Sequence, residues 1–296
     1  MESLHRLKCA ETWAGNQSGS SVAQLPGLRV SVHSRVFETG DAGGDVHYTS
    51  VCPSCIVSRV ALADVSGHGL AVSSMGIKLQ ELMHKHLAAL DQAHLMRDLN
   101  EAVRHDLDGI HYATMVAVGF HARRGFLVLT NAGHPPPLWY REDRHDWEWL
   151  ELQGAESGSG IRGTPLGLLP DVSYGRIVIK PTPGDIIVLY SDGVSEATSP
   201  DGKELGRDQL MAIARALGSR AAETLSTPPS ADRSSRVDEA PDTAILPRCA
   251  GGCWKLRGSA AGFHTRAARP PRASVAPADR VCRREATAIS CSYLDR

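Results

Sequence analysis

Residues 60–76 read VALADVSGHGLAVSSMG, and within them an apolar run stops at an acid and gives way to a helical pattern. Val60–Ala63 form the apolar run, Asp64 follows at once, and a Gly-His-Gly turn occupies 67–69. From Val72 to Leu90, apolar residues recur at steps of three or four, as one face of an amphipathic helix requires. The stretch therefore predicts a strand that carries a carboxylate to its end and turns directly into a helix.

Strand and helix patterns come in separate blocks on both sides of this stretch. The residues predict strands over 28–37, 46–51, 56–63, 112–120 and 126–140 (a hairpin joined by the turn HARRG), 175–180 and 185–190, and helices over 72–90, 93–107 and 207–217. Short Gly-rich or Pro-rich turns join many of the strands, which favours antiparallel pairing. The predicted fold class is α+β with largely antiparallel sheets.

Composition divides the chain into three regions. Residues 1–27 are a polar lead-in, whose Trp13 we expect to pack back onto the body of the protein. Residues 28–218 form the predicted domain, with about 247 as its furthest limit. Residues 219–296 are rich in Arg, Ala, Ser and Pro without helix or strand periodicity, so we expect a disordered, solvated tail rather than a segment that binds something acidic.

The overall charge and the cysteines limit the location and the partners. The 296 residues are 42% hydrophobic and 22% charged with a net charge of -1, which gives no reason to expect nucleic acid or a membrane surface as partner. No apolar run approaches the roughly 18 residues of a membrane span, and no secretory signal begins the chain, so the expected location is the cytoplasm. Seven cysteines without a regular framework favour free thiols, including Cys52 and Cys55 of the CPSC sequence.

Three acids occupy equivalent places in the pattern. Asp45 follows AGG, Asp64 follows VALA and Asp192 follows IIVLYS, each where a β-rich stretch meets a glycine-containing turn. If these carboxylates converged they would repel each other without a counter-ion, and Mg²⁺ or Mn²⁺ prefers such oxygen ligands. Two such ions about 3.5–4 Å apart can activate water for attack on phosphorus. Each acid taken alone is better explained as a turn or N-cap residue, and the spacing of all three supports that explanation and a metal site about equally.

Six sequence blocks add a family resemblance. GGDVHY, DVSGHGLAVS, YATMVAV, NAGHPPPLWY, GTPLGLLP and PGDIIVLYSDGVSEATSPDGKELG occur in this order within residues 38–206. Together they resemble the signature blocks of bacterial SpoIIE-type phosphatases in the PPM (protein phosphatase 2C-like) superfamily. The resemblance implies a sandwich of two mainly antiparallel β-sheets flanked by α-helices, with a two-metal centre at one end.

The same resemblance implies an activity and a partner. Two divalent cations, Mn²⁺ or Mg²⁺, would activate water to hydrolyse phosphoserine or phosphothreonine on a protein substrate. Relatives often act on phosphorylated anti-sigma-factor antagonists in partner-switching circuits, and we carry this partner class over as an expectation. The oligomeric state does not follow from the resemblance.

The resemblance also assigns roles to individual residues. Asp64 matches the acid that bridges both metals, and Val65 matches the residue whose backbone carbonyl completes one site. Asp45 and Asp192 match the acids of the GGD and DG blocks. The leaving serine oxygen needs a proton, and His68 is the candidate general acid because a histidine can be protonated near neutral pH. The alternative is that His68 only holds the turn.

The NAGHPPP block follows an apolar strand and carries a polar pair. Asn131 and His134 are expected to brace their loop through hydrogen bonds to the backbone. The less favoured alternative is that His134 reaches the substrate or a water at the metals.

The family's final block is altered in this chain. The family usually ends on a strand introduced by two acids, and the nearest match here is EAPDTAILPRC, where Pro241 stands in the first acid's place and Asp242 in the second's. Asp242 is therefore the candidate for the last metal ligand, and Pro247 interrupts the expected closing strand. The continuation fits an altered reading frame or a lineage-specific tail. The alternative function is therefore a catalytically impaired, phosphatase-like binding or regulatory module.

Overall fold

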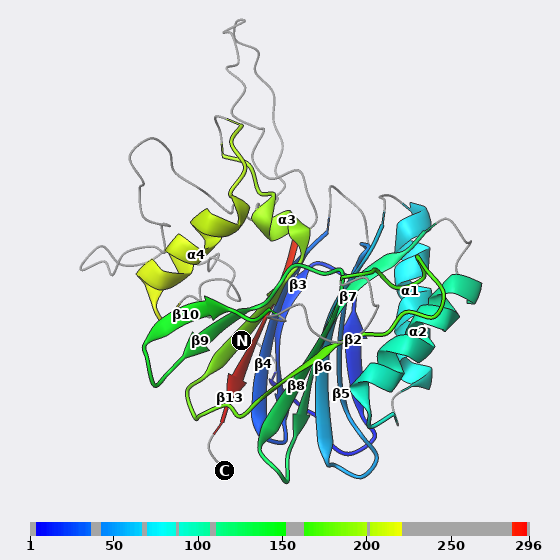
Figure 1. Ribbon diagram of the computed structural model, residues 1–296, viewed down its shortest axis with the longest axis horizontal. Helices are drawn as coiled ribbons and strands as arrows, with labels where there is room; N and C mark the ends of the chain where they lie inside the picture. The colour runs from blue at the N-terminus through cyan, green and yellow to red at the C-terminus, as the bar shows by residue number, and fades with distance from the viewer. Residues whose placement is uncertain are drawn as a thin grey trace, which may run out of the picture.

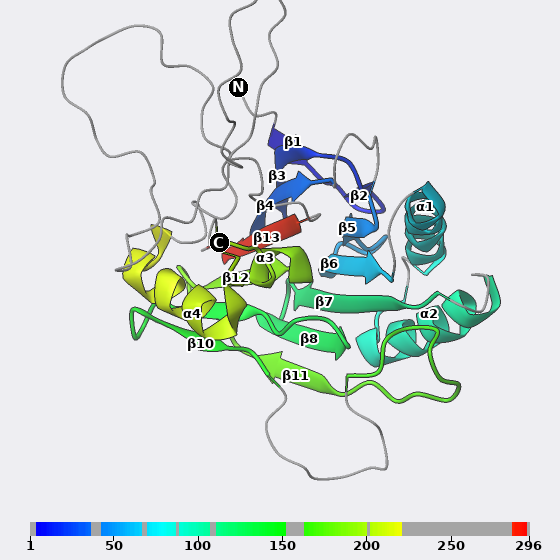
Figure 2. The same ribbon diagram turned by 90° about the horizontal axis from the view of Figure 1, so that it is seen from above.

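A computed structural model describes residues 4–36, 43–66, 70–86, 89–106, 111–151, 163–199, 202–220 and 286–294. In these residues two β-sheets face each other, with helices on both outer sides (Figures 1 and 2). Sheet A has, in spatial order, β1 (Leu4–Arg6), β3 (Gly19–Leu25), β4 (Leu28–Arg35), β13 (Ala286–Tyr293), β12 (Ile186–Tyr190), β9 (Leu138–Arg141) and β10 (Asp146–Trp149). Sheet B has β11 (Arg176–Ile179), β8 (Phe126–Ala132), β7 (Ala113–His121), β6 (Val57–Val65), β5 (Asp45–Val51) and β2 (Thr12–Gly15). The helices are α1 (Leu70–Lys85), α2 (Gln92–Asp106), α3 (Asp192–Ser195) and α4 (Gly206–Leu217).

Strand pairing follows the predicted pattern. Each hydrogen-bonded pair of these strands is antiparallel except β1 with β3, which is parallel. The predicted α+β class, with two mainly antiparallel sheets and flanking helices, is confirmed. Within the described residues, no helix combines the length and the apolar character needed to cross a membrane.

The main core lies between the two sheets. Leu62 of β6 and Val118 of β7 face Ile187 of β12 and Ile289 of β13, and each of these four side chains is buried. Alternate residues of a strand point to the same face, so this packing fixes which side of each strand faces the interior. Asp64 lies two residues beyond Leu62 and therefore shares its inward-facing side.

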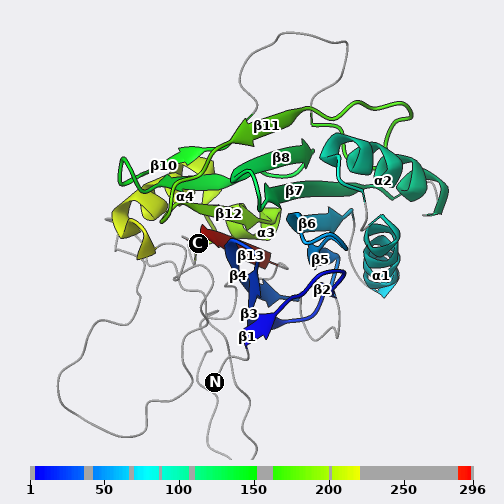
Figure 3. The same cartoon turned by 90° about the horizontal axis from the view of Figure 1, so that it is seen from below.

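The outer faces of both sheets are covered by helices. Ala61 and Ala63 of β6 lie on the outer face of sheet B, where their small side chains leave room for Leu79 of α1 and Leu99 of α2. On the other side, Leu210 of α4 belongs to a separate core cluster on sheet A. Figure 3 shows the two helix groups on opposite flanks of the sandwich. Because sheet B is covered on both faces, every residue of β5 and most residues of β6 are buried, including polar ones such as Thr49 and Arg59.

The N-terminal residues belong to the sandwich. β1 and β3 extend sheet A, and β2 forms the free edge of sheet B beside β5. Trp13 of β2 packs against the core cluster between the sheets, as expected from the sequence. What the sequence presents as a polar lead-in thus contributes strands to both sheets.

The strand β13 corrects the expected disordered tail for residues 286–293. It lies in the middle of sheet A, antiparallel to β4 on one side and β12 on the other. Its sequence, ATAISCSY, hides the usual strand signal because Thr287 and Ser290 are buried along with its apolar residues. The hydroxyl of Thr287 is satisfied by Ser34 of β4, 3.0 Å away. Residues 221–285 lie outside the described residues, so disorder there remains a prediction.

The expected free thiols are also corrected in part. Cys9 and Cys55 form a disulfide with a Cα–Cα distance of 5.0 Å, whereas Cys52 and Cys291 are free. The pairing of β2 with β5 brings Cys9 beside the turn that joins β5 to β6. The two cysteines are 46 residues apart in sequence, so spacing alone gives no sign of the bond.

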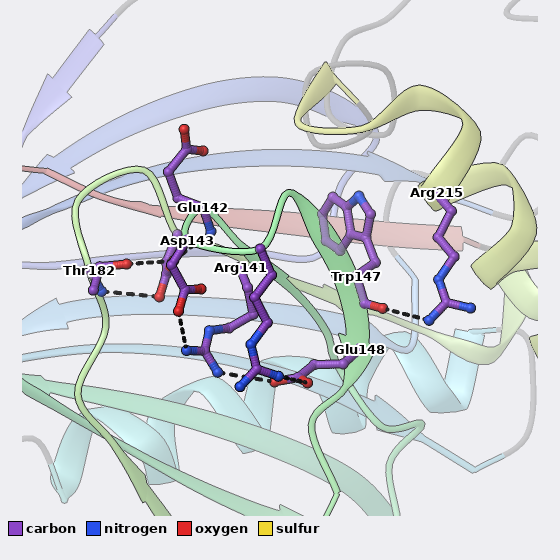
Figure 4. Close-up of polar contacts among 9 residues, drawn as sticks. Arg141, Glu142, Asp143, Trp147, Glu148, Thr182 and Arg215 are labelled. Atoms are coloured by element: carbon purple, nitrogen blue, oxygen red, sulfur yellow. Dashed lines mark hydrogen bonds and ion pairs between the residues drawn. The ribbon is translucent and has the colours of Figure 1, made fainter.

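Buried Asp185, the residue just before β12, has a structural role. Its carboxylate accepts hydrogen bonds from the Glu142 N–H and from the N–H and hydroxyl of Thr182. It thus ties the loop before β12 to the β9–β10 hairpin. Figure 4 shows this hairpin, where Arg141 lies between the carboxylates of Asp143 and Glu148.

Candidate metal centre

Three strands of sheet B place polar residues in one row at the same end of the sandwich. Asp45 of β5 lies directly opposite Asp64 of β6, which lies directly opposite Thr114 of β7. Directly opposed residues on neighbouring strands share a face of the sheet. The row formed by Asp45, Asp64 and Thr114 therefore faces inward, toward sheet A. This register brings together two of the three acids that the sequence singles out.

Sheet A meets this row through Ser191, at the end of β12. The Ser191 hydroxyl donates a hydrogen bond of 2.7 Å to Oδ2 of Asp45. β13 holds Ser191 in place, because the Thr287 N–H donates to Ser191 Oγ at 2.9 Å and the Ser191 N–H donates to the Thr287 carbonyl at 2.9 Å. Asp45 is only 2% exposed, so this contact offsets part of the cost of burying its carboxylate.

Asp192 follows Ser191 and is the first residue of the short helix α3. Its side chain is exposed, whereas Ser191 is buried. α3 lies over the end of the sandwich where β12 and β13 meet (Figure 1). Because Ser191 contacts Asp45, the neighbouring Asp192 is anchored beside the same end of the sandwich.

Gly44 allows the backbone to pass close to the oxygens of the next strand. A Cβ placed on Gly44 would lie 3.2 Å from the Val65 carbonyl oxygen and 3.5 Å from Oδ1 of Asp64. It would also lie 2.6 Å from Cγ1 of Val72, a distance at which neighbouring atoms must move. The Val65 N–H donates to the Gly44 carbonyl at 3.3 Å. The Val65 carbonyl and the Asp64 carboxylate thus lie beside Gly44, where a side chain could fit only if Val72 moved.

The available oxygens match the chemistry of a hard divalent cation. Mg²⁺ and Mn²⁺ are bound mainly by carboxylate, carbonyl and water oxygens, and this end of the sandwich offers Asp45, Asp64 and the Val65 carbonyl. Gly44 lets the backbone of this end pack closely against Val72 and the Val65 carbonyl. Within the described ranges, no group of three His, Cys, Asp or Glu side chains lies close enough to hold a metal ion.

Two of the predicted site residues cannot be placed. His68, the candidate general acid, and Asp242, the candidate last ligand, both lie outside the described residues. Their roles remain predictions from the sequence.

The NAGHPPP loop is braced as the sequence predicts. The Asn131 side chain donates to the His134 carbonyl at 2.8 Å and accepts from the His134 N–H at 2.8 Å. The His134 ring extends the brace to the polar row, because its Nδ1 lies 2.8 Å from the Thr114 hydroxyl. Burial lowers the pKa of His134 to about 3, and the Tyr190 carbonyl only partly opposes that shift. The ring is therefore neutral at pH 7 and serves as a hydrogen-bonding group.

Ser191 and Thr114 are site residues that sequence reasoning did not single out. Both lie inside the quoted family blocks, next to Asp192 and in YATMVAV respectively. Serine and threonine are common in strands and turns, so their presence gives little signal. Their importance appears only through strand register and the contact between the sheets.

The comparisons with known proteins identify the family of this chain. The profile of the family described as "Stage II sporulation protein E (SpoIIE)" matches residues 58–228, more than half of the 296 residues. The chain belongs to the SpoIIE family. The resemblance drawn from the sequence blocks is thereby confirmed.

Among proteins similar to this SpoIIE-family chain is "Phosphoserine phosphatase RsbU" of Bacillus subtilis (strain 168). It is 26% identical over 148 residues, which cover 49% of this chain and 41% of RsbU. The chain thus matches less than half the length of this curated relative.

Two solved structures share the fold of the SpoIIE-family chain. One is that of the RsbU and RsbW domains of Rv1364c from Mycobacterium tuberculosis, with a TM-score of 0.61, 16% identity, and coverage of 94% of this chain and 63% of that one. The other is RsbX in complex with magnesium, with a TM-score of 0.54, 11% identity, and coverage of 93% and 100%. At these identities the likeness supports the fold alone.

Proposed function

We propose that this chain is a metal-dependent protein phosphatase that hydrolyses phosphoserine or phosphothreonine on a protein substrate. The observation that carries the proposal is the meeting of Asp45, Asp64 and Ser191 at one end of the sandwich. Two carboxylates that lie side by side on adjacent strands and face the interior cost free energy. A cation or hydrogen-bond donors must offset their charge. Family membership and the name of RsbU, a phosphoserine phosphatase, support the same reaction.

Each proposed ligand has a defined place in the chain. Asp64, Asp45, the Val65 carbonyl and Asp192 would hold the two cations, Mn²⁺ or Mg²⁺. Asp242 is the proposed final ligand. When bound, the cations supply an activated water and neutralise the charge of the phosphate. The magnesium named with the RsbX structure supports this cofactor class.

The chain's own residues would perform the remaining tasks. Ser191 holds one oxygen of Asp45, so the second oxygen keeps a fixed direction. The neutral His134 ring fixes Thr114 at the other end of the row. His68 would donate the proton that the leaving serine or threonine oxygen needs.

The proposed setting is bacterial signalling of the partner-switching type. The substrate would be a phosphorylated protein of the anti-sigma-factor antagonist class, in the cytoplasm, without nucleic acid or membrane as partner. The similarity to RsbU supports this setting for the matched region.

The experiment measures phosphate release from a phosphoserine protein by the full chain with Mn²⁺. We expect Asp64→Asn to lower the metal-stimulated rate at least about 100-fold, because the bridging ligand is lost. Asp143→Asn, which removes an exposed carboxylate on the β9–β10 hairpin, is the matched control and should keep the wild-type rate. Equal rates for Asp64→Asn and the wild type would show that the reaction does not use this centre.

A second function is favoured by the altered final block. Pro241 stands where the family has its first acid, and the described residues supply fewer than three clustered acids. A chain that lacks one ligand would bind the phosphoprotein without turning it over. Calorimetry with the phosphoprotein, run beside the turnover assay, separates the two: binding without turnover supports the binding module, and steady turnover excludes it.

A further inference from the structure

A second chemical site lies in the turn between β5 and β6, at the end of β5 opposite Asp45. Here three cysteines meet: Cys9 and Cys55 are joined as a disulfide, and Cys52 is a free, buried thiol. We propose that Cys9, Cys52 and Cys55 form a thiol–disulfide exchange site in which Cys52 attacks the sulfur of Cys55 and releases Cys9. This proposal is independent of the phosphatase proposal.

The surroundings of Cys52 stabilise a thiolate. Its sulfur accepts hydrogen bonds from the N–H groups of Ile56 at 3.3 Å and Val57 at 3.2 Å. The Ser54 hydroxyl lies 3.2 Å from the same sulfur. Burial would by itself raise the pKa of the Cys52 thiol, but these hydrogen bonds outweigh burial and lower it. Hydrogen-bond donors to a sulfur stabilise the thiolate, which is the nucleophilic form of cysteine.

Arg59 is a buried cationic side chain on β6, shortly after this turn. It is 3% exposed; burial lowers its pKa, and electrostatic interaction with Tyr48 and Cys52 opposes that shift. Arg59 is fixed by a hydrogen bond of 2.6 Å from its Nη2 to the Ala89 carbonyl. A cation held near the sulfur favours the thiolate over the thiol.

The turn geometry brings Cys52 within reach of Cys55. The Cys55 N–H donates to the Cys52 carbonyl at 2.9 Å, which closes a four-residue turn. Such turns hold their first and last Cα atoms within about 7 Å, and disulfides form over a similar range of distances. Cys55 also has a φ of 54°, a left-handed conformation that residues other than glycine seldom adopt. Backbone outliers of this kind collect at reactive sites.

The exchange conserves atoms and electrons. The Cys52 thiolate forms a bond to Sγ of Cys55, the Cys9–Cys55 bond breaks, and Cys9 leaves as a thiolate that takes up the proton lost by Cys52. One disulfide and one thiol are present before and after the step, so no external oxidant is required. Cys9 is exposed, and the thiol it regains is therefore accessible to reagents.

The exchange also releases a covalent tie. The Cys9–Cys55 bond joins the N-terminal segment to the β5–β6 turn across 46 residues. After exchange, that segment is held on β5 by backbone contacts, including Ala10 N–H to the Val51 carbonyl and Val51 N–H to the Glu11 carbonyl, both 3.0 Å.

The test maps the disulfides of the full chain by mass spectrometry. The protein is equilibrated in a glutathione redox buffer, freed of glutathione, and incubated without oxygen in iodoacetamide. Trypsin then gives peptide 9–29, which holds Cys9, and peptide 36–59, which holds both Cys52 and Cys55. We expect the wild type to yield alkylated Cys9 and a peptide 36–59 closed by its own disulfide.

The variants decide whether Cys52 is the nucleophile. In Cys52→Ser, and in Cys52→Ala as a second variant, peptides 9–29 and 36–59 should stay cross-linked and alkylation of Cys9 should fall at least about tenfold. Cys291→Ser removes the other free thiol of the described residues and should match the wild type. The proposal is overturned if the wild type keeps Cys9 cross-linked and unalkylated, if the Cys52 variants release Cys9 as fast as the wild type, or if no glutathione ratio yields the Cys9–Cys55 bond.

Discussion

At the scale of single residues, the candidate centre depends on contacts that link the two sheets. Ser191 at the end of β12 contacts Asp45 of β5, and β13 holds Ser191 from behind. His134 contacts Thr114, which lies beside Asp64. Asp45 is therefore positioned by a neutral neighbour, and a second neutral group, His134, holds the Thr114 that lies opposite Asp64.

Gly44 provides a direct test of the close packing at the centre. In Gly44→Ala the new methyl group would meet Val72 at 2.6 Å and the Val65 carbonyl at 3.2 Å. We expect a loss of about 1–3 kcal/mol in the free energy of unfolding from overpacking, together with weaker metal-dependent activity.

Urea unfolding measures this change, and Gly19→Ala is the control. A Cβ on Gly19, the first residue of β3, meets nothing within 4 Å. It should leave the free energy of unfolding within about 0.5 kcal/mol of the wild type. Equal effects at the two glycines would contradict the tight packing described for Gly44.

His134 gives a pH dependence of stability. Its pKa is lowered to about 3 in the folded chain by burial, whereas an exposed histidine titrates near 6.5. The unfolded chain therefore binds a proton first, so stability is complete above about pH 6.5 and falls as the pH drops toward about 3.

Urea unfolding at pH 7 and pH 5.5 checks this sign. Replacement of His134 by Gln should reduce the loss of stability between the two pH values by about 1 kcal/mol. Replacement of the exposed His94 by Gln should leave that loss unchanged. An unchanged loss in His134→Gln would mean that the ring is protonated in the folded state.

At the scale of elements, β13 is the strand that completes sheet A. It separates β4 from β12, so its removal would expose two strand edges in the middle of the sheet. It also holds Ser191 and through it Asp45. The strand therefore connects the stability of sheet A to the geometry of the candidate centre.

The effect of β13 can be measured with Ile289→Ala. Ile289 is fully buried between the sheets, so the cavity left by the smaller side chain should cost about 2–5 kcal/mol of unfolding free energy. Ser292→Ala on the same strand is only partly buried and should change stability by less than about 1 kcal/mol. A similar small change for both, in a urea titration, would contradict a central place for β13.

At the scale of the whole molecule, much of the fold could be predicted from residue patterns. The 3.6-residue periodicity at Val72–Leu90 predicted α1, which begins at Leu70 and already ends at Lys85, and the apolar run ending at Asp64 predicted β6. α1 has one face against the core and β6 is covered on both faces, so a helical period marks the first and a continuous apolar run marks the second. β13 could not be predicted because small polar residues fill its buried positions and mask the alternation.

The candidate centre could be predicted only in part. Asp45, Asp64 and Asp192 stand out because each ends a β-rich stretch, but strand register decides that Asp45 lies opposite Asp64. The partner Ser191 and the Cys9–Cys55 bond are long-range contacts, which depend on how the sheets pair. No local pattern encodes such contacts.

The proposed activity requires that Asp64 and its neighbours bind a divalent cation. The most direct measurement is a titration of the full chain with Mn²⁺, with free Mn²⁺ followed by electron paramagnetic resonance. We predict saturable binding by the wild type and by Asp143→Asn, and a loss of at least about tenfold in affinity for Asp64→Asn. Binding of Mn²⁺ by Asp64→Asn with the same affinity and stoichiometry as the wild type would contradict a metal site that includes Asp64.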